Sequence, residues 1–347
     1  GIGRGDYSIV YIAPEQIRTR SVVEALKKRE VGLIAIDEAH CVSQWGHDFR
    51  PDYFALKQWM ETELCGGQPR NFPLVALTAT ARQTYHGLAE QELSNEISTV
   101  QDIIEKLGLH VSDKQTIIGS PERSELDLQV EQIHIPCSRC QGFLEYVQPK
   151  LRCPSCGFTE EHYKEKLRSI KREKLIELLK NDLRHRWEHD SKTYQRGIIY
   201  CRTTGATEEL AAEIEGEIAE LQGKVAAYHG KMGQVERKNV YTRFIEDGEN
   251  GLRLVVATNA FGMGIDAAHL GLVLHYDVPA TPEAYYQEAG RAGRNFKKGE
   301  FAQCILFYHD ADLEGQRWLM DQNKITEQDG LNVYQALCNI RQQRHDT

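Results

Sequence analysis

The apolar positions of this 347-residue chain gather into short runs that alternate with longer amphipathic segments. In the first third, strand-like runs occur at Ser8–Ile12, Leu33–Ile36 and Leu74–Leu77. Leu33–Ile36 shows no period-2 alternation, which is typical of a strand buried on both faces of a parallel sheet. Ser21–Glu30 has the pattern of the helix that a parallel crossover requires, and residues 84–108 are also predicted to be helical. This part of the chain therefore predicts an α/β fold.

The second half of the chain repeats the alternation. Helical segments at 206–221, 233–246 and 281–292 separate most of its apolar runs. Such an order predicts a mostly parallel sheet with right-handed crossovers. The predicted strands are Gly197–Tyr200, Val225–Tyr228, Leu254–Ala257, Leu272–His275 and Ala302–Phe307.

These patterns divide the chain into four parts, because two α/β regions flank a short cysteine-bearing insertion. The predicted parts are a partial first domain over 1–131, an insertion over 132–160, a second domain with a leading helix over 161–310 and a helical tail over 311–347. At this length the chain has room for two domains of ordinary size.

The formal net charge is −9, which argues against a general nucleic-acid coat but leaves room for a local basic cleft. No apolar run approaches the length of a membrane span, and no signal peptide is visible. The five cysteines outside the insertion are scattered, which fits a reducing compartment better than a disulfide framework. We therefore expect an intracellular protein, cytoplasmic or nuclear, with no membrane partner.

The insertion carries two Cys-x-x-Cys pairs with twelve residues between them. Each pair can direct two thiolates toward one tetrahedral ion, and two pairs at this spacing predict a structural Zn²⁺ site. The alternative is a pair of redox motifs. The predicted ligands are Cys137, Cys140, Cys153 and Cys156. The protein partner of such an insertion is left open by the sequence.

Two acids end the second predicted strand, where ligand chemistry sits in open α/β sheets. Asp37 is placed to hold Mg²⁺ beside nucleotide phosphates, and Glu38 to orient or deprotonate an attacking water. His40 is placed to hydrogen-bond onward from that site. The alternative is an ordinary surface turn.

The next loop is rich in aromatic residues beside charged ones. Trp45, His47 and Phe49 lie next to Arg50, and exposed aromatics on a loop indicate stacking on nucleic-acid bases. The alternative is that these rings pack beneath the loop. Stacking, or coupling of a nucleic-acid site to the acids, is the favoured interpretation.

The stretch DEAHCVSQWGHDFRP resembles motif II and the aromatic-rich loop of RecQ-type DNA helicases. Further motifs follow the order of that family, and the resemblance spans roughly residues 7 to 310. They are IVYIAPEQI (9–17, motif Ib), VALTATA (75–81, motif III), GIIYCRTT (197–204, motif IV), VVATNAFGMGID (255–266, motif V) and YYQEAGRAGR (285–294, motif VI).

The resemblance implies two RecA-like domains, the first incomplete, which close on ATP and Mg²⁺. It implies that Gln287, Arg291 and Arg294 of motif VI act in catalysis, with Arg294 as the finger that stabilises charge on the transferred phosphoryl group. A helical turn is expected to place the two arginines on one face. In motif V, Gly264 lets the backbone approach the nucleotide, and Asp266 holds a motif VI arginine.

The resemblance also implies a DNA partner, as single strands and duplex junctions, with 3′-to-5′ movement. Thr78 and Thr80 of motif III would link the ATP state to DNA, and Arg202, Thr203 and Thr258 would contact strand phosphates. A loop-capping role is the alternative for the residues of motif IV. The aromatic-rich loop favours a DNA over an RNA helicase.

A phosphate-cradling loop of the form GxxxxGK[ST] does not occur in the 347 residues. The glycines of GIGRG (1–5) lack the following lysine and hydroxyl residue. We therefore expect a fragment that begins inside the first domain and does not hydrolyse ATP by itself. The competing hypothesis is a zinc-containing DNA-binding module that does not hydrolyse ATP.

Overall fold

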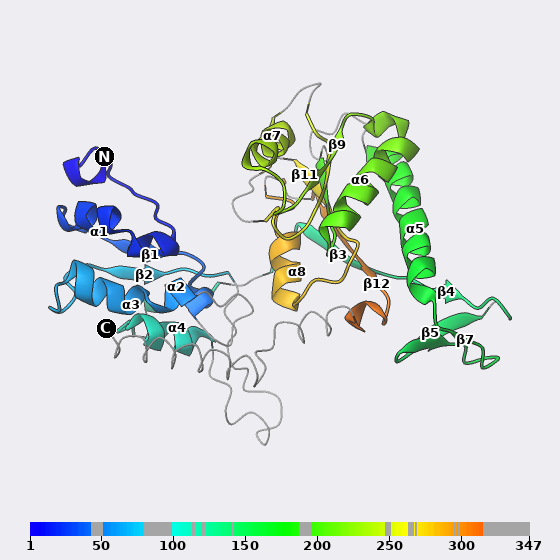
Figure 1. Ribbon diagram of the computed structural model, residues 1–347, viewed down its shortest axis with the longest axis horizontal. Coiled ribbons are helices and arrows are strands. Elements are labelled where there is room, and N and C mark those ends of the chain that lie inside the picture. Colours follow the sequence, from blue (N-terminus) through cyan, green and yellow to red (C-terminus); the bar gives the residue numbers. More distant parts are fainter. Residues whose placement is uncertain are drawn as a thin grey trace, which may run out of the picture. The chain divides into compact units, whose positions relative to one another are not determined.

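The computed structural model describes residues 1–42, 51–79, 99–112, 115–119, 122–140, 142–186, 196–246, 251–262, 267, 269–294, 296–297 and 299–314. It divides into two compact units, Gly1–Glu122 and Arg123–Thr347, and each is considered by itself (Figure 1).

The first unit is built around two parallel strands. β1 (Ile34–Ile36) pairs in parallel with β2 (Leu74–Ala76), so both predicted strands are present. The predicted burial of Leu33–Ile36 on both faces is wrong, because Leu33 is 56% exposed and Ala35 is exposed as well. The surrounding α-helices are α1 (Arg20–Lys27), α2 (Pro51–Phe54), α3 (Leu56–Trp59) and α4 (Thr99–Leu107). Shorter turns are the 3₁₀ helices η1 (Ile2–Arg4), η2 (Pro14–Arg18) and η3 (Ala39–Val42), and the π-helix η4 (Met60–Leu64).

One predicted strand of this unit is wrong. Ser8–Ile12 forms no strand, and Tyr11 is 94% exposed. An apolar run becomes a strand only when a neighbouring strand takes up its backbone hydrogen bonds, and within the described ranges none lies beside this one. The predicted helix over 84–108 is confirmed for α4, and its earlier part lies outside the described residues.

The second unit contains a six-stranded sheet in which every pairing is parallel. All five predicted strands are present, so the mostly parallel sheet is confirmed. In spatial order the strands are β3 (Leu126–Gln132), β12 (Ala302–Tyr308), β11 (Leu270–His275), β8 (Arg196–Tyr200), β10 (Leu254–Ala257) and β9 (Val225–Tyr228).

The strand β3 was not predicted. It lies at the sheet edge, where it pairs with β12 from Leu126 opposite Ala302 to Gln132 opposite Tyr308. Apolar and polar residues alternate along it, and Val130 is 65% exposed, so it lacks the continuous apolar run of a central strand. The division between the units therefore falls between Glu122 and Arg123, before the boundary at 131 that the sequence suggested.

Helices cover both faces of this sheet, as parallel strands require. On one face lie α5 (Tyr163–Arg186) and α6 (Thr204–Glu217); on the other lie α7 (Gln234–Ile245) and α8 (Pro282–Ala289) (Figure 1). A short 3₁₀ helix, η6 (Ala219–Leu221), follows α6. No described helix, even the 24-residue α5, is apolar enough over a sufficient length to cross a membrane.

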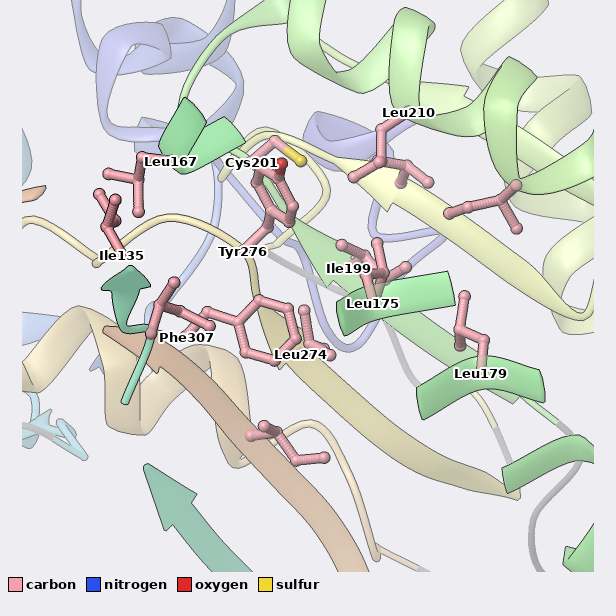
Figure 2. Close-up of a cluster of buried hydrophobic side chains, with 14 of the residues drawn as sticks. Ile135, Leu167, Leu175, Leu179, Ile199, Cys201, Leu210, Leu274, Tyr276 and Phe307 are labelled. Carbon is pink, nitrogen blue, oxygen red and sulfur yellow. The ribbon is translucent and has the colours of Figure 1, made fainter. Parts of the chain in front are cut away.

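Successive strand residues point into the two opposite cores. Ile199 of β8 lies in the core beneath α5 and α6, whereas Ile198 lies in the core beneath α7 and α8, and both are fully buried. Figure 2 shows Leu175 and Leu179 of α5 beside Ile199 and Leu274 of the strands. The helix is therefore an integral layer of the unit, despite its many charged residues.

The cysteine-bearing insertion is a small antiparallel sheet between β3 and α5. Its strands are β4 (Ile135–Pro136), β5 (Phe143–Val147), β6 (Lys150–Arg152) and β7 (Thr159–Glu160). The inner residues Ile135, Leu144 and Leu151 belong to the same buried cluster as Leu167 of α5. Lys166 of α5 also donates to the carbonyl oxygen of Pro136 at 3.0 Å. The insertion is thus packed onto the second unit.

A buried ion pair fixes α5 to the segment that follows β12. Lys171 Nζ lies 2.8 and 2.9 Å from the two carboxylate oxygens of Asp312, and it also donates to the carbonyl oxygen of Tyr276 at 3.0 Å. Lys171 is 2% and Asp312 7% exposed. Asp312 accepts a further hydrogen bond from the His309 backbone N–H, so both charges are well satisfied.

We predict that Lys171→Met destabilises the second unit by about 3–5 kcal/mol, because Asp312 is left as a buried charge without its cation. Urea unfolding followed by amide exchange in β11 and β12 measures this loss. The exposed pair between Lys174 and Glu131 supplies the control: Lys174→Met should cost no more than about 1 kcal/mol. Equal losses in the two variants would contradict this account of the buried pair.

Candidate functional site

In the first unit, the two acids follow β1 directly. Asp37 is exposed at the carboxyl end of the strand, and its carboxylate accepts the Glu38 backbone N–H at 2.9 Å. Glu38 has a φ of 49°, in the left-handed region that residues other than glycine rarely occupy. The Ala39 N–H donates to the carbonyl oxygen of Leu77, so the turn is held against the end of β2. An exposed carboxylate at this position suits a hard cation such as Mg²⁺.

His40 connects the acids to motif III. It is 2% exposed, and its Nδ1 lies 2.9 Å from Thr78 Oγ1 and 3.4 Å from Glu38 Oε2. The structure therefore brings Asp37, Glu38, His40 and Thr78 together. Thr80 and the aromatic-rich loop with Trp45, His47, Phe49 and Arg50 lie outside the described residues.

In the second unit, motif IV lies at the carboxyl end of β8. The Arg202 N–H donates to the Asp277 carboxylate at 2.8 Å, and its guanidinium reaches the carbonyl oxygen of Asp312 at 3.3 Å. Thr203 is the N-cap of α6, because its hydroxyl accepts the Ala206 N–H at 3.2 Å. The capping role considered for this motif is thus present for Thr203.

Motif V starts at the end of β10. Thr258 is 8% exposed, and its hydroxyl accepts the Ala260 N–H at 3.4 Å. The carbonyl oxygen of Phe261 accepts the hydroxyl of Tyr200 at 2.9 Å, which ties motif V to the end of motif IV's strand. Burial raises the pKa of Tyr200, although Arg291 nearby opposes this, so the hydroxyl stays a donor. Gly264 and Asp266 lie outside the described residues.

Motif VI begins on α8, which carries Gln287, but its arginines do not lie on a helix. The helix ends at Ala289, and Gly293 with a φ of 70° breaks the path between the arginines. Arg291 is half-buried against motif V, where a Cβ on Gly262 would lie 3.2 Å from its Nη2, whereas Arg294 is exposed. The prediction of a shared helical face is therefore wrong, because the glycines end the helix first.

Sequence reasoning missed a buried pair that supports α8. Nε2 of His275, which is 0% exposed and ends β11, lies 2.9 Å from Glu288 Oε2. The imidazole lies between the rings of Tyr200 and Tyr285, with centroids 5.3 and 4.8 Å away. A histidine that ends a fully apolar run, thirteen residues before a glutamate of the next helix, was the available signal.

The four cysteines of the insertion lie together. Their sulfur atoms are all within 4.8 Å of one another, with 3.7 Å between Cys137 and Cys156 and 3.4 Å between Cys140 and Cys153. A disulfide would need about 2.05 Å. A tetrahedral zinc site with Zn–S distances of about 2.3 Å places its sulfurs about 3.8 Å apart. The cluster is thus compatible with zinc.

The surroundings of the cluster favour the thiolate form of Cys153. Burial raises the pKa of Cys153, but the backbone N–H groups of Cys156 and Ser155 and the Cys140 thiol outweigh it and lower that pKa to about 6. A hydrogen bond from the Gly142 backbone N–H lowers the pKa of Cys140, but the neighbouring thiols outweigh it and raise that pKa to about 12. A divalent ion would replace these shared protons, because a metal-bound cysteine is a thiolate.

Known protein families match parts of both units. The family described as DEAD/DEAH box helicase matches residues 2–88, and the Helicase conserved C-terminal domain matches residues 164–296. The solved structure of Mycobacterium smegmatis helicase Lhr, at 21% identity and a TM-score of 0.54, covers 90% of this chain and 34% of its own, and so shares its fold. The chain therefore carries the paired motor domains of a superfamily 2 helicase.

Two similar bacterial proteins indicate the family within this class of helicases. ATP-dependent DNA helicase RecQ of Bacillus subtilis is 30% identical over 94% of this chain and 42% of its own length. RecQ of Haemophilus influenzae is 32% identical over 89% of this chain and 37% of its own length. The chain belongs to the RecQ family, and it spans less than half the length of these two relatives.

Proposed function

We propose that the complete protein is an ATP-dependent DNA helicase of the RecQ type that moves 3′ to 5′ on one strand and unwinds duplex DNA. The observation that carries this proposal is the contact of His40 with both Glu38 and Thr78. One buried imidazole thereby joins the acids of motif II to motif III. A motor needs such a connection, because hydrolysis must change how nucleic acid is held.

On the ATP side, Asp37 would hold Mg²⁺, which would neutralise charge on the phosphates. Glu38 orients the attacking water and accepts its proton. Gln287 and Arg291 support Arg294, whose exposed guanidinium stabilises the charge that develops on the transferred phosphoryl group.

On the DNA side, strand-end groups of the second unit contact phosphates. The Thr203 hydroxyl accepts the Ala206 N–H, and its own hydrogen remains to be donated to a phosphate oxygen. Arg202 and Thr258 lie at the ends of neighbouring strands and act alongside it. These contacts position a strand without reading its bases. Base stacking falls to the aromatic-rich loop over 43–50.

The cysteine cluster holds one structural Zn²⁺ ion in this proposal. Four thiolates fill a tetrahedral site and leave no ligand position for water, so the ion would serve the fold of the insertion rather than the reaction. Cys137 and Cys153 are buried beside Leu144 and Leu151, in the cluster that α5 shares. The metal would therefore also support the docking of the insertion on α5.

The zinc assignment predicts one zinc ion per chain and its loss in Cys153→Ser/Cys156→Ser. The apolar residues of the insertion and of α5 belong to one buried cluster. Amide exchange should therefore rise both in β5 and β6 and in the first turns of α5. Metal analysis and exchange measure these effects, with Cys65→Ser of the first unit as the control. A zinc-free wild-type chain, or a disulfide within the cluster under reducing conditions, would contradict the assignment.

A second candidate function is a DNA-binding module that does not hydrolyse ATP. Both candidates bind DNA, and they differ in whether the complete protein turns over ATP.

In the complete protein, we predict DNA-stimulated ATP hydrolysis that falls about 10²–10⁴-fold in Glu38→Gln, which loses the water-orienting acid. Arg294→Ala should lower it by about 10³–10⁵-fold, the usual value of an arginine finger. Steady-state rates with and without single-stranded DNA measure both. Glu61→Gln, an exposed acid of η4, is the control. Wild-type DNA binding without any ATP turnover would overturn the helicase proposal in favour of the binding module.

A further inference from the structure

An arginine outside the helicase motifs holds the motif VI turn. Arg123 Nη1 donates to the carbonyl oxygen of Gly290, and Nη2 to that of Ala292, both at 3.1 Å. These two carbonyls flank Arg291 in the chain. A guanidinium presents its donors in a fixed planar fork, so this double contact sets the direction as well as the position of the turn.

The turn has physical reasons to need such a partner. It follows the end of α8, where the last carbonyls of a helix have no partners within the helix and the helix dipole favours a cation. Gly293 then takes a φ of 70°, and a Cβ there would lie 3.0 Å from Glu125 Cγ. Arg291 and Ala292 keep only the i→i−3 bonds to Glu288 and Ala289, and the Gly293 N–H donates to the carbonyl oxygen of Leu270 at 3.0 Å. Because the glycine ends the regular helical path, the shape of the turn also depends on contacts from outside it.

Glu125 fixes the guanidinium in turn. The Arg123 Nε donates to the Glu125 carboxylate, so all three nitrogens of the guanidinium donate hydrogen bonds at once. The backbone N–H of Glu125 and the Arg123 guanidinium lower the pKa of Glu125, which keeps its carboxylate ionised. The Glu125 carbonyl oxygen also accepts the Ala302 N–H at 2.8 Å, which anchors this segment to β12.

Arg123 also lies at the boundary between the two units in the chain. It is the first residue of the second unit, directly after Glu122, the last residue of the first. The covalent connection between the units therefore enters the second unit at the motif VI turn. Three residues later the chain becomes β3, whose Leu126 pairs with Ala302.

We propose that Arg123 is a positioning residue for motif VI, which holds Arg291 against motif V and presents Arg294 for phosphoryl transfer. This assignment rests on the proposed ATPase function. Arg123 lies behind the turn and holds its backbone, so it acts through the motif VI arginines and is not itself catalytic.

The test compares Arg123→Gln and Arg123→Lys in the complete protein. Both remove the planar fork, and only the second keeps the charge. We expect kcat for ATP to fall about 10- to 100-fold in both, because a misplaced reacting group costs rate even when the misplacement is small. The KM for ATP should stay within about twofold, since the lost interaction acts in the transition state. Arg172→Gln, at an exposed arginine paired with Glu213, is the control and should be unchanged.

Amide exchange gives a readout that does not depend on activity. In both Arg123 variants, exchange should rise in the motif VI turn over 290–294 and stay unchanged at the start of α6. Full activity in Arg123→Lys together with loss in Arg123→Gln would show that charge alone matters and would overturn the assignment. Lost activity without faster exchange in the turn, or faster exchange with normal kcat, would overturn it too.

The two proposals fail in different ways. A complete wild-type protein that shows no ATP turnover contradicts the proposed function, and the catalytic part of this assignment falls with it. An active wild type whose Arg123 variants match the control contradicts only the role of Arg123. If Arg123→Gln does not fold, as judged by circular dichroism, Arg123→Lys decides between these outcomes.

Discussion

The structure of the second unit depends on one constraint: a parallel sheet must be covered on both faces. A sheet of six parallel strands needs cover on both faces, and among the described residues α6, α7 and α8 follow β8, β9 and β11 and supply it together with α5. The same connectivity places the carboxyl ends of β8, β10 and β11 at one edge of the sheet. Motifs IV and V and the His275 that supports α8 all follow from that arrangement.

The insertion is adapted to the same constraint. Its small sheet shares a hydrophobic core with α5, the helix that covers one face of the large sheet together with α6. One turn further along α5, the ion pair of Lys171 with Asp312 fixes the helix beside the carbonyl oxygen of Tyr276. The cysteine-bearing insertion is thus packed as part of the second unit.

Features carried by local patterns could be predicted from the sequence, and features carried by long-range contacts could not. The apolar runs located β8 to β12 because each of these strands leaves a continuous apolar signal, even β9 at one edge of the sheet, whereas β3 at the other edge alternates and leaves none. The motif spacing located Asp37, Glu38 and the four cysteines. The bond from Arg123 to Gly290 spans 167 positions, and nothing near either residue announces it. Ser8–Ile12 failed because a strand needs a partner that its own sequence does not specify.

Strand displacement by the complete protein tests the central claim most directly. Duplexes of one sequence, carrying a single-stranded tail at either the 3′ or the 5′ side, distinguish a directional motor from a DNA-binding module. The helicase account predicts that ATP and Mg²⁺ together release the labelled strand from the 3′-tailed duplex and leave the 5′-tailed duplex intact. Tight binding to both duplexes with no ATP-dependent release from either would contradict it.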